Sequence, residues 1–294
     1  MATTEHEKRA TRNELQELLL QGAEALQQRR QEWLSAVAAQ PVWRVRRRVL
    51  WRTLRMTLHL LTGVMVALLS GLMFMPYSRL HRPLIAWWHR RLCAILNIRI
   101  RVHGTAEAGA CLWVSNHVSW LDIPVLGALF SPYFLAKAEV ASWPLLGSLA
   151  KASGTLFIRR GSGDSKQVGN GLAEHLRQGR SVLFFPEGTT TDGKQLKRFF
   201  HRLFQAAVKA GCPVQPVLLC YTLDQQLHPW APFIGDDEIL SHARQILSLD
   251  SVVVDVRILP RQQFDGQDAR QWCYDVEAVM YAALQQLLAE VTLM

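Results

Sequence analysis

The spacing of hydrophobic positions predicts helices in the first third of the chain. Between residues 12 and 38, apolar residues recur at steps of three, four or seven, which is the pattern of an amphipathic helix. Residues 56–75 contain only one ionisable group, His59, and this length matches the roughly 20 residues that a bilayer-spanning helix needs. Residues 80–98 place apolar side chains on one face and arginines mostly on the other, which is typical of a helix at a membrane surface.

From residue 110 onward, short apolar runs alternate with helical stretches. Candidate strands are 111–114, 133–136, 155–158, 182–185, 214–220 and 252–258. Candidate helices are 123–130, 166–178, 199–210 and 269–290. This alternation predicts an α/β fold in which a largely parallel sheet is flanked by helices. We therefore expect a helical extension at 1–40, membrane-associating helices at 41–101 and one globular domain at 102–294.

The basic excess of the chain lies entirely in its first third. Residues 1–101 hold 17 Lys and Arg against 6 Asp and Glu, whereas residues 102–294 hold 16 against 18. No acidic residue stands between Glu32 and Glu107, a stretch that contains twelve arginines. Such a cluster beside an apolar run suits an anionic membrane surface. A nucleic-acid site is disfavoured because Leu and Trp, rather than polar residues, separate the arginines.

Three arrangements of the apolar helices are compatible with the sequence. One helix could cross the bilayer, both could enter one leaflet as a pair, or the pair could form a buried hairpin. Arginine on both sides of 56–75 gives no orientation by the positive-inside rule. The buried hairpin is disfavoured because so many arginines would need buried partners.

The five cysteines are scattered, and no two of them form a Cys-x-x-Cys pair. This usage indicates reduced thiols in a cytosolic compartment, without a zinc site or a disulfide framework. The apolar segment begins too far from Met1 to be a signal peptide.

The segment that follows the candidate strand 111–114 reads Asn-His-Val-Ser-Trp-Leu-Asp, from Asn116 to Asp122. On one helix His117 and Asp122 would point about 140° apart, so they can meet only if His117 lies in the loop and Asp122 in the first helical turn. A histidine whose far nitrogen contacts a carboxylate can act as a general base. The alternatives are a helix-capping role for Asp122 and an ordinary loop histidine.

Two further segments carry candidate chemistry. Residues 185–194 form a turn rich in Gly and Thr after a strand, whose N–H and hydroxyl groups could surround a polar ligand, or which could simply reverse the chain. Residues 154–160 end a strand in two arginines, which could bind a phosphate or carboxylate, or could be an ordinary surface pair. The sequence contains no Gly-x-Ser-x-Gly, so it gives no support to a nucleophile-elbow hydrolase.

Together these segments resemble the lysophosphatidic acid acyltransferase family of glycerolipid acyltransferases over residues 80–260. That family has four blocks in a fixed order. The blocks are matched here by Asn116, His117 and Asp122; by Gly154, Phe157, Ile158 and Arg160; by Phe185, Pro186, Glu187, Gly188 and Thr189; and by the Pro-rich strand from Pro213 to Val217. The linking run Lys137-Ala138-Glu139 is also typical of the family.

The resemblance implies that His117 and Asp122 are catalytic and that residues of the other blocks bind substrate. The substrate-binding candidates are Asn116, Lys137, Gly154, Phe157, Arg160, Glu187, Gly188 and Thr189. It further implies an acyl thioester of coenzyme A or acyl carrier protein as co-substrate, no bound cofactor and no metal. The default acceptor is 1-acyl-glycerol 3-phosphate, and the enzyme would lie on the cytoplasmic face of the inner membrane among membrane lipids.

The main departure from the family is Thr190, where relatives commonly have arginine. Even without this arginine, a phosphate acceptor is slightly favoured over a lyso-ornithine lipid, because four basic residues remain near the matched blocks. They are Lys137, Arg160, Lys197 and Arg198. A membrane lipid hydrolase and a non-catalytic membrane adaptor are the rival functions. The first lacks a candidate nucleophile or metal site in this sequence, and the second does not explain the intact His117 and Asp122.

Overall fold

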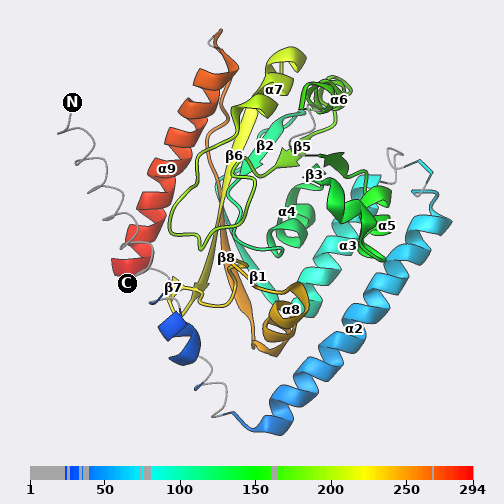
Figure 1. Cartoon of the computed structure of the whole chain (residues 1–294), viewed down its shortest axis with the longest axis vertical. Helices are drawn as coiled ribbons and strands as arrows, with labels where there is room; N and C mark the ends of the chain where they lie inside the picture. The colour runs from blue at the N-terminus through cyan, green and yellow to red at the C-terminus, as the bar shows by residue number, and fades with distance from the viewer. Residues whose placement is uncertain are drawn as a thin grey trace, which may run out of the picture. The chain divides into compact units, whose positions relative to one another are not determined.

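The computed structural model describes residues 24, 27–32, 35, 40–72, 74–75, 81–159, 165–266 and 268–293. The chain divides into two compact units, Met1–Arg48 and Val49–Met294. Within the first unit, residues 24, 27–32 and 35 of the expected helix at 12–38 are helical, and the other positions of that helix lie outside the described residues. The second unit contains every element on which the candidate chemistry depends (Figure 1).

The second unit is built on a mostly parallel sheet, which confirms the predicted α/β class. Its described strands are β1 (Ile98–His103), β2 (Leu112–Ser115), β3 (Tyr133–Lys137), β4 (Leu156–Ile158), β5 (Val182–Phe184), β6 (Val214–Leu223), β7 (Gln226–Leu227) and β8 (Val252–Ile258). Their spatial order is β1-β8-β6-β2-β5-β3-β4, with β7 paired to β6. Strands β6, β2, β5, β3 and β4 are parallel, whereas β8 runs antiparallel to β6.

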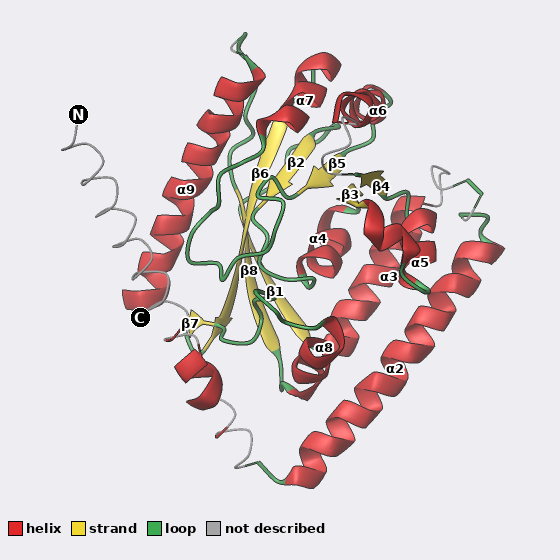
Figure 2. Cartoon of the chain, in the orientation of Figure 1, coloured by secondary structure: helices red, strands yellow, loops and turns green. Residues whose placement is uncertain are grey.

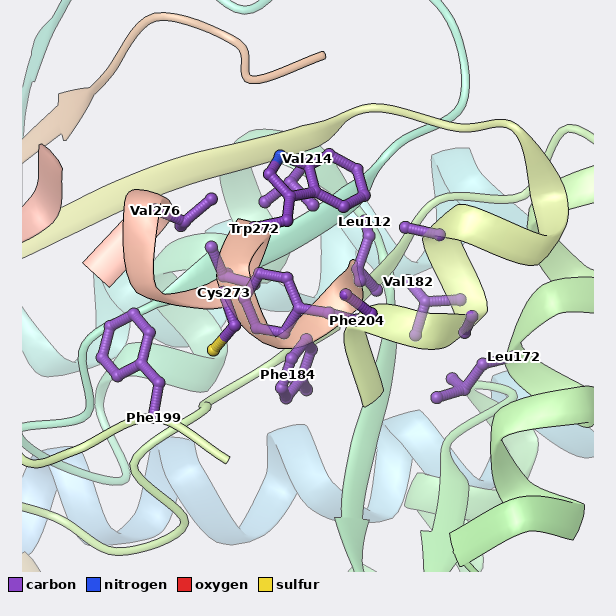
Figure 3. Packing of buried hydrophobic residues seen from close by; sticks show 14 of the residues in the cluster. Leu112, Leu172, Val182, Phe184, Phe199, Phe204, Val214, Trp272, Cys273 and Val276 are labelled. Carbon is purple, nitrogen blue, oxygen red and sulfur yellow. The ribbon is translucent and has the colours of Figure 1, made fainter. Parts of the chain in front are cut away.

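Helices lie on both faces of the sheet (Figure 2). The described helices are α2 (Val42–Leu69), α3 (His81–Leu96), α4 (Asp122–Phe130), α5 (Leu146–Ala152), α6 (Ser165–Arg177), α7 (Phe204–Ala210), α8 (Ile239–Ser248) and α9 (Ala269–Leu293), with 3₁₀ turns η1 (Ala138–Ser142) and η2 (His201–Leu203). Leu112 of β2 belongs to a buried cluster with Phe204 of α7 and Trp272 of α9 (Figure 3). The next residue, Trp113, points to the other face and stacks on Phe130 of α4 at 4.2 Å between ring centroids.

The sequence pattern missed β1, β7, α5 and α8. Strand β1 alternates Ile and Arg within the arginine-rich stretch, and it pairs with β8 from Ile98 onward. The expected boundary between residues 101 and 102 therefore falls inside a strand of the sheet. The helix predicted from residue 199 is also shorter, because η2 precedes α7.

Close packing joins α2 and α3. His59, Gly63 and Ala67 form the buried stripe of α2, at steps of four residues. A Cβ atom on Gly63 would lie 2.5 Å from the indole nitrogen of Trp88, so only glycine permits this approach of α2 to α3. Trp88 stacks on His59 at 4.7 Å between ring centroids, whereas its neighbour Trp87 is exposed. The two tryptophans therefore differ in their surroundings, because Trp88 is held between the helices whereas Trp87 is exposed.

Two of the arginines beside the apolar helices bind backbone carbonyls. Arg52 of α2 donates to Leu247, Leu249 and Asp250, at the carboxyl end of α8. Arg90 of α3 donates to Ala128 in the last turn of α4. Carbonyl groups at a helix carboxyl end carry partial negative charge, so guanidinium groups stabilise them there. These contacts attach α2 to the end of α8 and α3 to the end of α4.

Among the described residues, α2 is the one helix that is long and apolar enough to cross a membrane. Its face opposite the His59 stripe exposes large apolar side chains. They include Leu50, Leu54, Leu58, Leu61, Met65 and Leu68. One face of α2 therefore packs on the rest of the protein. The opposite face is apolar, and no described residue covers it.

Candidate active site

The site begins where β6 extends beyond β2. Ser115, the last residue of β2, is level with Val217 of β6, and β6 continues to Leu223. The side chain of the next residue, Asn116, occupies the vacant edge of β6. Its amide nitrogen donates to the Leu219 carbonyl at 2.9 Å, and its oxygen accepts the Leu219 N–H at 2.8 Å. The asparagine amide thus imitates one more peptide of β2 and fixes the start of the histidine loop.

His117 lies in that loop and Asp122 is the first residue of α4, the arrangement that their spacing requires. Nδ1 of His117 is 2.7 Å from Oδ2 of Asp122. Because a carboxylate accepts, Nδ1 carries the proton and Nε2 keeps its lone pair. The same Oδ2 accepts the N–H groups of Val118 at 2.8 Å and Ser119 at 3.0 Å. Asp122 therefore holds the backbone of the histidine loop and orients His117 at once, whereas the N-cap position of α4, Leu121, has no side-chain cap.

The imidazole is partly accessible while its carboxylate partner is fully buried. The side chain of His117 is 20% exposed and that of Asp122 is 0% exposed. The His117 ring stacks on Phe185, with centroids 3.9 Å apart and planes inclined by 11°. The Asp122 carboxylate, the Phe185 ring and the loop backbone thus restrict the His117 imidazole from several sides. Nε2 of His117 makes no hydrogen bond to the residues that the structure describes.

Glu187 joins the histidine loop to the loop that follows β5. Its Oε1 accepts the His117 N–H at 2.9 Å and its Oε2 accepts the Lys197 N–H at 2.8 Å. The side chain is 3% exposed. Burial raises the pKa of Glu187 to about 7, although the two N–H donors oppose this shift. The role of Glu187 in the geometry is to hold two backbone segments together.

The threonine-rich turn contacts the same region. Gly188 has a φ of 67°, which allows the sharp turn after Glu187. Thr189 is exposed, whereas the N–H of Thr191 donates to the His117 carbonyl at 2.8 Å. The Thr190 hydroxyl donates to the Phe233 carbonyl. Thr190 therefore uses its hydroxyl inside the protein, and the position that commonly holds arginine in the family supplies no cation here.

Of the other predicted residues, Lys137 lies at the carboxyl end of a parallel strand. Lys137 ends β3 and is exposed at the edge where His117 follows β2 and Glu187 follows β5. Phe157 lies in β4, level with Ala136 of β3. Gly154 lies at the opposite end of β4, where its φ of 72° ends α5, so the structure does not bring it to this edge. Arg160 lies outside the described residues.

Two residues near the dyad carried no signal in the sequence patterns. The hydroxyl of Tyr221, in β6, donates to Oδ1 of Asp122 at 2.7 Å. Phe233 accepts from Thr190, and its N–H donates to the Val118 carbonyl at 2.9 Å. Tyr221 stands in an apolar strand and Phe233 in an irregular loop, so neither residue had a spacing that could reveal it.

A histidine held against a buried carboxylate at the carboxyl edge of an α/β sheet is suited to activating the hydroxyl of an acceptor molecule. The chain belongs to the acyltransferase family: the family model described as Acyltransferase matches residues 99–220. It is an acyltransferase of lysolipids, as its relatives also indicate.

Two curated relatives and one solved structure show the range of the similarity. The chain is 47% identical to a lyso-ornithine lipid O-acyltransferase of Pseudomonas aeruginosa over 205 residues, which cover 70% of this chain and 80% of that protein. It is 33% identical to a 1-acyl-sn-glycerol-3-phosphate acyltransferase of Neisseria gonorrhoeae over 183 residues, 62% of this chain and 71% of that protein.

The fold is similar to that of the crystal structure of the 1-acyl-sn-glycerophosphate acyltransferase PlsC from Thermotoga maritima. The TM-score is 0.55 at 20% identity, and the match covers 80% of this chain and 97% of that one. At this identity the likeness concerns the fold alone.

Proposed function

We propose that His117 is the general base that activates the acceptor hydroxyl for direct attack on an acyl thioester. Nε2 takes the hydroxyl proton as the oxygen attacks the carbonyl carbon. A tetrahedral intermediate then collapses, the C–S bond breaks and the new ester C–O bond remains. The imidazolium returns its proton to the departing thiolate, so the enzyme ends in its starting state.

The observation that carries this proposal is the 2.7 Å contact between Nδ1 of His117 and Oδ2 of the buried Asp122. The carboxylate selects the tautomer with a basic Nε2 and stabilises the imidazolium that forms during transfer. A general base contributes about 10²–10⁴ in rate. The partial exposure of His117 leaves its free nitrogen open to an incoming hydroxyl.

For the acceptor, we propose a lyso-ornithine lipid, whose free hydroxyl lies on an acyl chain and whose head group is zwitterionic. Relatives named as lyso-ornithine lipid O-acyltransferases reach 47% identity, against 33% and 35% for two named as 1-acyl-sn-glycerol-3-phosphate acyltransferases. The contact between Thr190 and Phe233 supports the same choice, because phosphate recognition usually rests on arginine.

The second candidate acceptor is 1-acyl-glycerol 3-phosphate, which the sequence alone slightly favoured. Exposed Lys137 at the catalytic edge of the sheet is the observation in its favour, because an ammonium group can bind a phosphate as a point charge. Arg198 is a weaker candidate than its position suggested, since its guanidinium donates to the Tyr274 hydroxyl of α9 at 2.8 Å. Arg160 stays a prediction from the family block.

The remaining roles are proposals of the same kind. Asn116 fixes the start of the histidine loop, and Glu187, Gly188 and Thr189 shape the acceptor side of the site. Phe157 contributes an apolar surface near Lys137. The donor is a thioester of coenzyme A or acyl carrier protein, and the proposed steps use no metal or bound cofactor.

We further propose that the exposed face of α2 enters one leaflet on the cytoplasmic side of the membrane. Its buried stripe packs on α3, and Arg52 binds the carboxyl end of α8, so this helix is attached to the catalytic unit along much of its length. A helix held in this way can lie against a bilayer without carrying the catalytic unit across it. Residues 41–101 would then be the membrane-associating element.

An acceptor panel with labelled acyl thioester tests the proposed reaction. The purified full chain receives lyso-ornithine lipid, 1-acyl-glycerol 3-phosphate or no lipid, with His117→Ala as the control for background transfer. We expect label in ornithine lipid with wild-type enzyme alone. Transfer only to 1-acyl-glycerol 3-phosphate would show that the proposed acceptor is wrong, whereas the proposed acyl transfer would stand. If free fatty acid were released at the same rate with and without a lipid acceptor, the enzyme would be a hydrolase. Both the proposed acceptor and the proposed transfer reaction would then be wrong.

A further inference from the structure

Tyr221 is a buried hydroxyl donor to the side of Asp122 that does not face His117. Oδ2 of the carboxylate receives three N–H groups, whereas Oδ1 receives the Tyr221 hydroxyl at 2.7 Å. Tyr221 is 2% exposed and Asp122 is 0% exposed, so water does not compete for this bond. Burial, followed by the negative charge of Asp122, raises the pKa of Tyr221 well above its usual value, and the phenol therefore stays a donor.

The position of Tyr221 in β6 makes this contact rigid. Leu219, two residues earlier on the same strand, holds Asn116 through both its N–H and its carbonyl. Tyr221 itself is level with Val254 of β8 in the antiparallel ladder. One central strand thus fixes both ends of the loop that carries His117: the backbone of Leu219 holds Asn116, and the side chain of Tyr221 holds Asp122.

We propose that Tyr221 is a positioning residue of the transfer reaction, which acts on His117 through Asp122. Its hydroxyl fixes the rotation of the buried carboxylate so that Oδ2 faces Nδ1 of His117. It also draws negative charge toward Oδ1 and so limits how strongly Asp122 holds the imidazolium. This inference rests on the proposed base role of His117.

Two ionisable groups face Asp122 and Tyr221 from the surrounding elements. Glu187 approaches from the loop after β5, and Cys93 faces Tyr221 from α3. Burial raises the pKa of Cys93 to about 12, so its thiol stays neutral. Among the described residues, Glu187 is a group near the dyad whose charge changes near neutral pH, and it is unaltered in the test below.

The test is Tyr221→Phe, which removes one oxygen and keeps the ring. We expect kcat to fall about ten- to a hundredfold, the range for loss of a hydrogen bond to a charged group, with KM for both substrates nearly unchanged. The acid limb of the kcat/KM profile should move to higher pH, because the carboxylate that lacks its phenol donor holds the imidazolium proton more tightly. Tyr274→Phe is the matched control, since it removes a hydroxyl that contacts Arg198 on the surface of α9.

A double-mutant cycle separates positioning from simple stability. In an Asp122→Asn background, Tyr221→Phe should change kcat by less than about twofold, because the partner through which Tyr221 acts has lost its charge. The inference is wrong if Tyr221→Phe leaves both kcat and the acid limb unchanged. It is also wrong if Tyr221→Phe lowers kcat equally in the wild-type and Asp122→Asn backgrounds. A fall in activity that only matches the fall in folded fraction, measured by circular dichroism, would likewise overturn it. If His117→Ala keeps wild-type activity, the proposed function itself fails, and this result is independent of Tyr221.

Discussion

Glu187 accepts the main-chain N–H of His117 at 2.9 Å, and so a carboxylate holds the backbone of the proposed base without contacting its ring. Its other oxygen accepts the N–H of Lys197. The family block that contains Glu187 therefore acts, in this chain, as a connection between two loops of the site. This position gives Glu187 a measurable effect on stability.

Replacing Glu187 should change how stability depends on pH. The pKa of Glu187 in the folded protein is about 7, above its ordinary value of 4.5, so folding favours the protonated acid. The resulting stability is fully present below pH 4.5 and is lost as pH rises through 7. Wild type should therefore lose about 3 kcal/mol relative to Glu187→Gln between these limits. Denaturant titrations in detergent at several pH values measure this difference.

The control for this titration is Glu238→Gln, at an exposed glutamate before α8. Its stability should run parallel to that of wild type across the same pH range. At low pH, Glu187→Gln should still be less stable than wild type, because an amide can accept only one of the two N–H groups. A wild-type curve parallel to that of Glu187→Gln would show that Glu187 has an ordinary pKa.

His117→Ala should abolish acyl transfer, with a loss of at least about a hundredfold, and should leave folding and vesicle binding intact. Asp122→Asn should lower kcat by orders of magnitude, because an amide can stabilise the wrong histidine tautomer. The surface offers a matched control in His103→Ala, since Nε2 of His103 lies 2.8 Å from Asp255 in an exposed pair. If His117→Ala kept more than about a tenth of the rate, His117 would not be the base.

Thr190→Val should raise KM for the acceptor about two- to tenfold, whereas Thr190→Ser should stay close to wild type. Valine keeps the shape of threonine but cannot donate to the Phe233 carbonyl, and the Phe233 loop also holds the histidine loop through Val118. Steady-state kinetics with the preferred acceptor separate the two variants. Equal behaviour of Val and Ser would mean that the hydroxyl contact has no part in acceptor binding.

Thr190→Arg tests the choice of acceptor at the same position. The new guanidinium should raise catalytic efficiency for 1-acyl-glycerol 3-phosphate relative to lyso-ornithine lipid, because arginine can bind the phosphate. The ratio of kcat/KM for the two acceptors is the measurement. No change in this ratio would place the acceptor head group away from residue 190.

Trp87→Ala should weaken binding to anionic vesicles, because its exposed ring can enter the membrane interface. Trp88→Ala should instead lower the melting temperature, because Trp88 stacks on His59 between α2 and α3. Vesicle sedimentation and thermal unfolding in detergent distinguish the two effects. Equal loss of vesicle binding in both variants, with no change in melting temperature, would contradict the packing of Trp88.

Cysteine labelling tests the one-leaflet arrangement. Arg55→Cys and Gln225→Cys each place a thiol at an exposed position, the first on α2 and the second in the turn before β7. An impermeant maleimide should label both from the same side of sealed membrane vesicles. Labelling from opposite sides would establish a true transmembrane span.

The sequence by itself determined the class of fold and the candidate base. Alternation of short apolar runs with helical periods located six strands, since burial on both faces imposes continuous apolar runs on parallel strands. The spacing of His117 and Asp122 was informative because a loop followed by a helix start lets the two side chains meet. Both relationships join residues that are close together in the chain, so the spacing of residues in the sequence is enough to predict them.

Only the tertiary structure decided which distant residues support the site. Tyr221 reaches Asp122 from 99 residues away, and Arg52 reaches Leu249 from 197 residues away. Trp87 and Trp88 are neighbours with the same chemistry, yet Trp87 is exposed and Trp88 is partly buried against His59 of α2. Hydrogen bonds and packing between distant segments depend on the order and length of the strands, and in this protein the extension of β6 beyond β2 places Leu219 and Tyr221 beside the histidine loop.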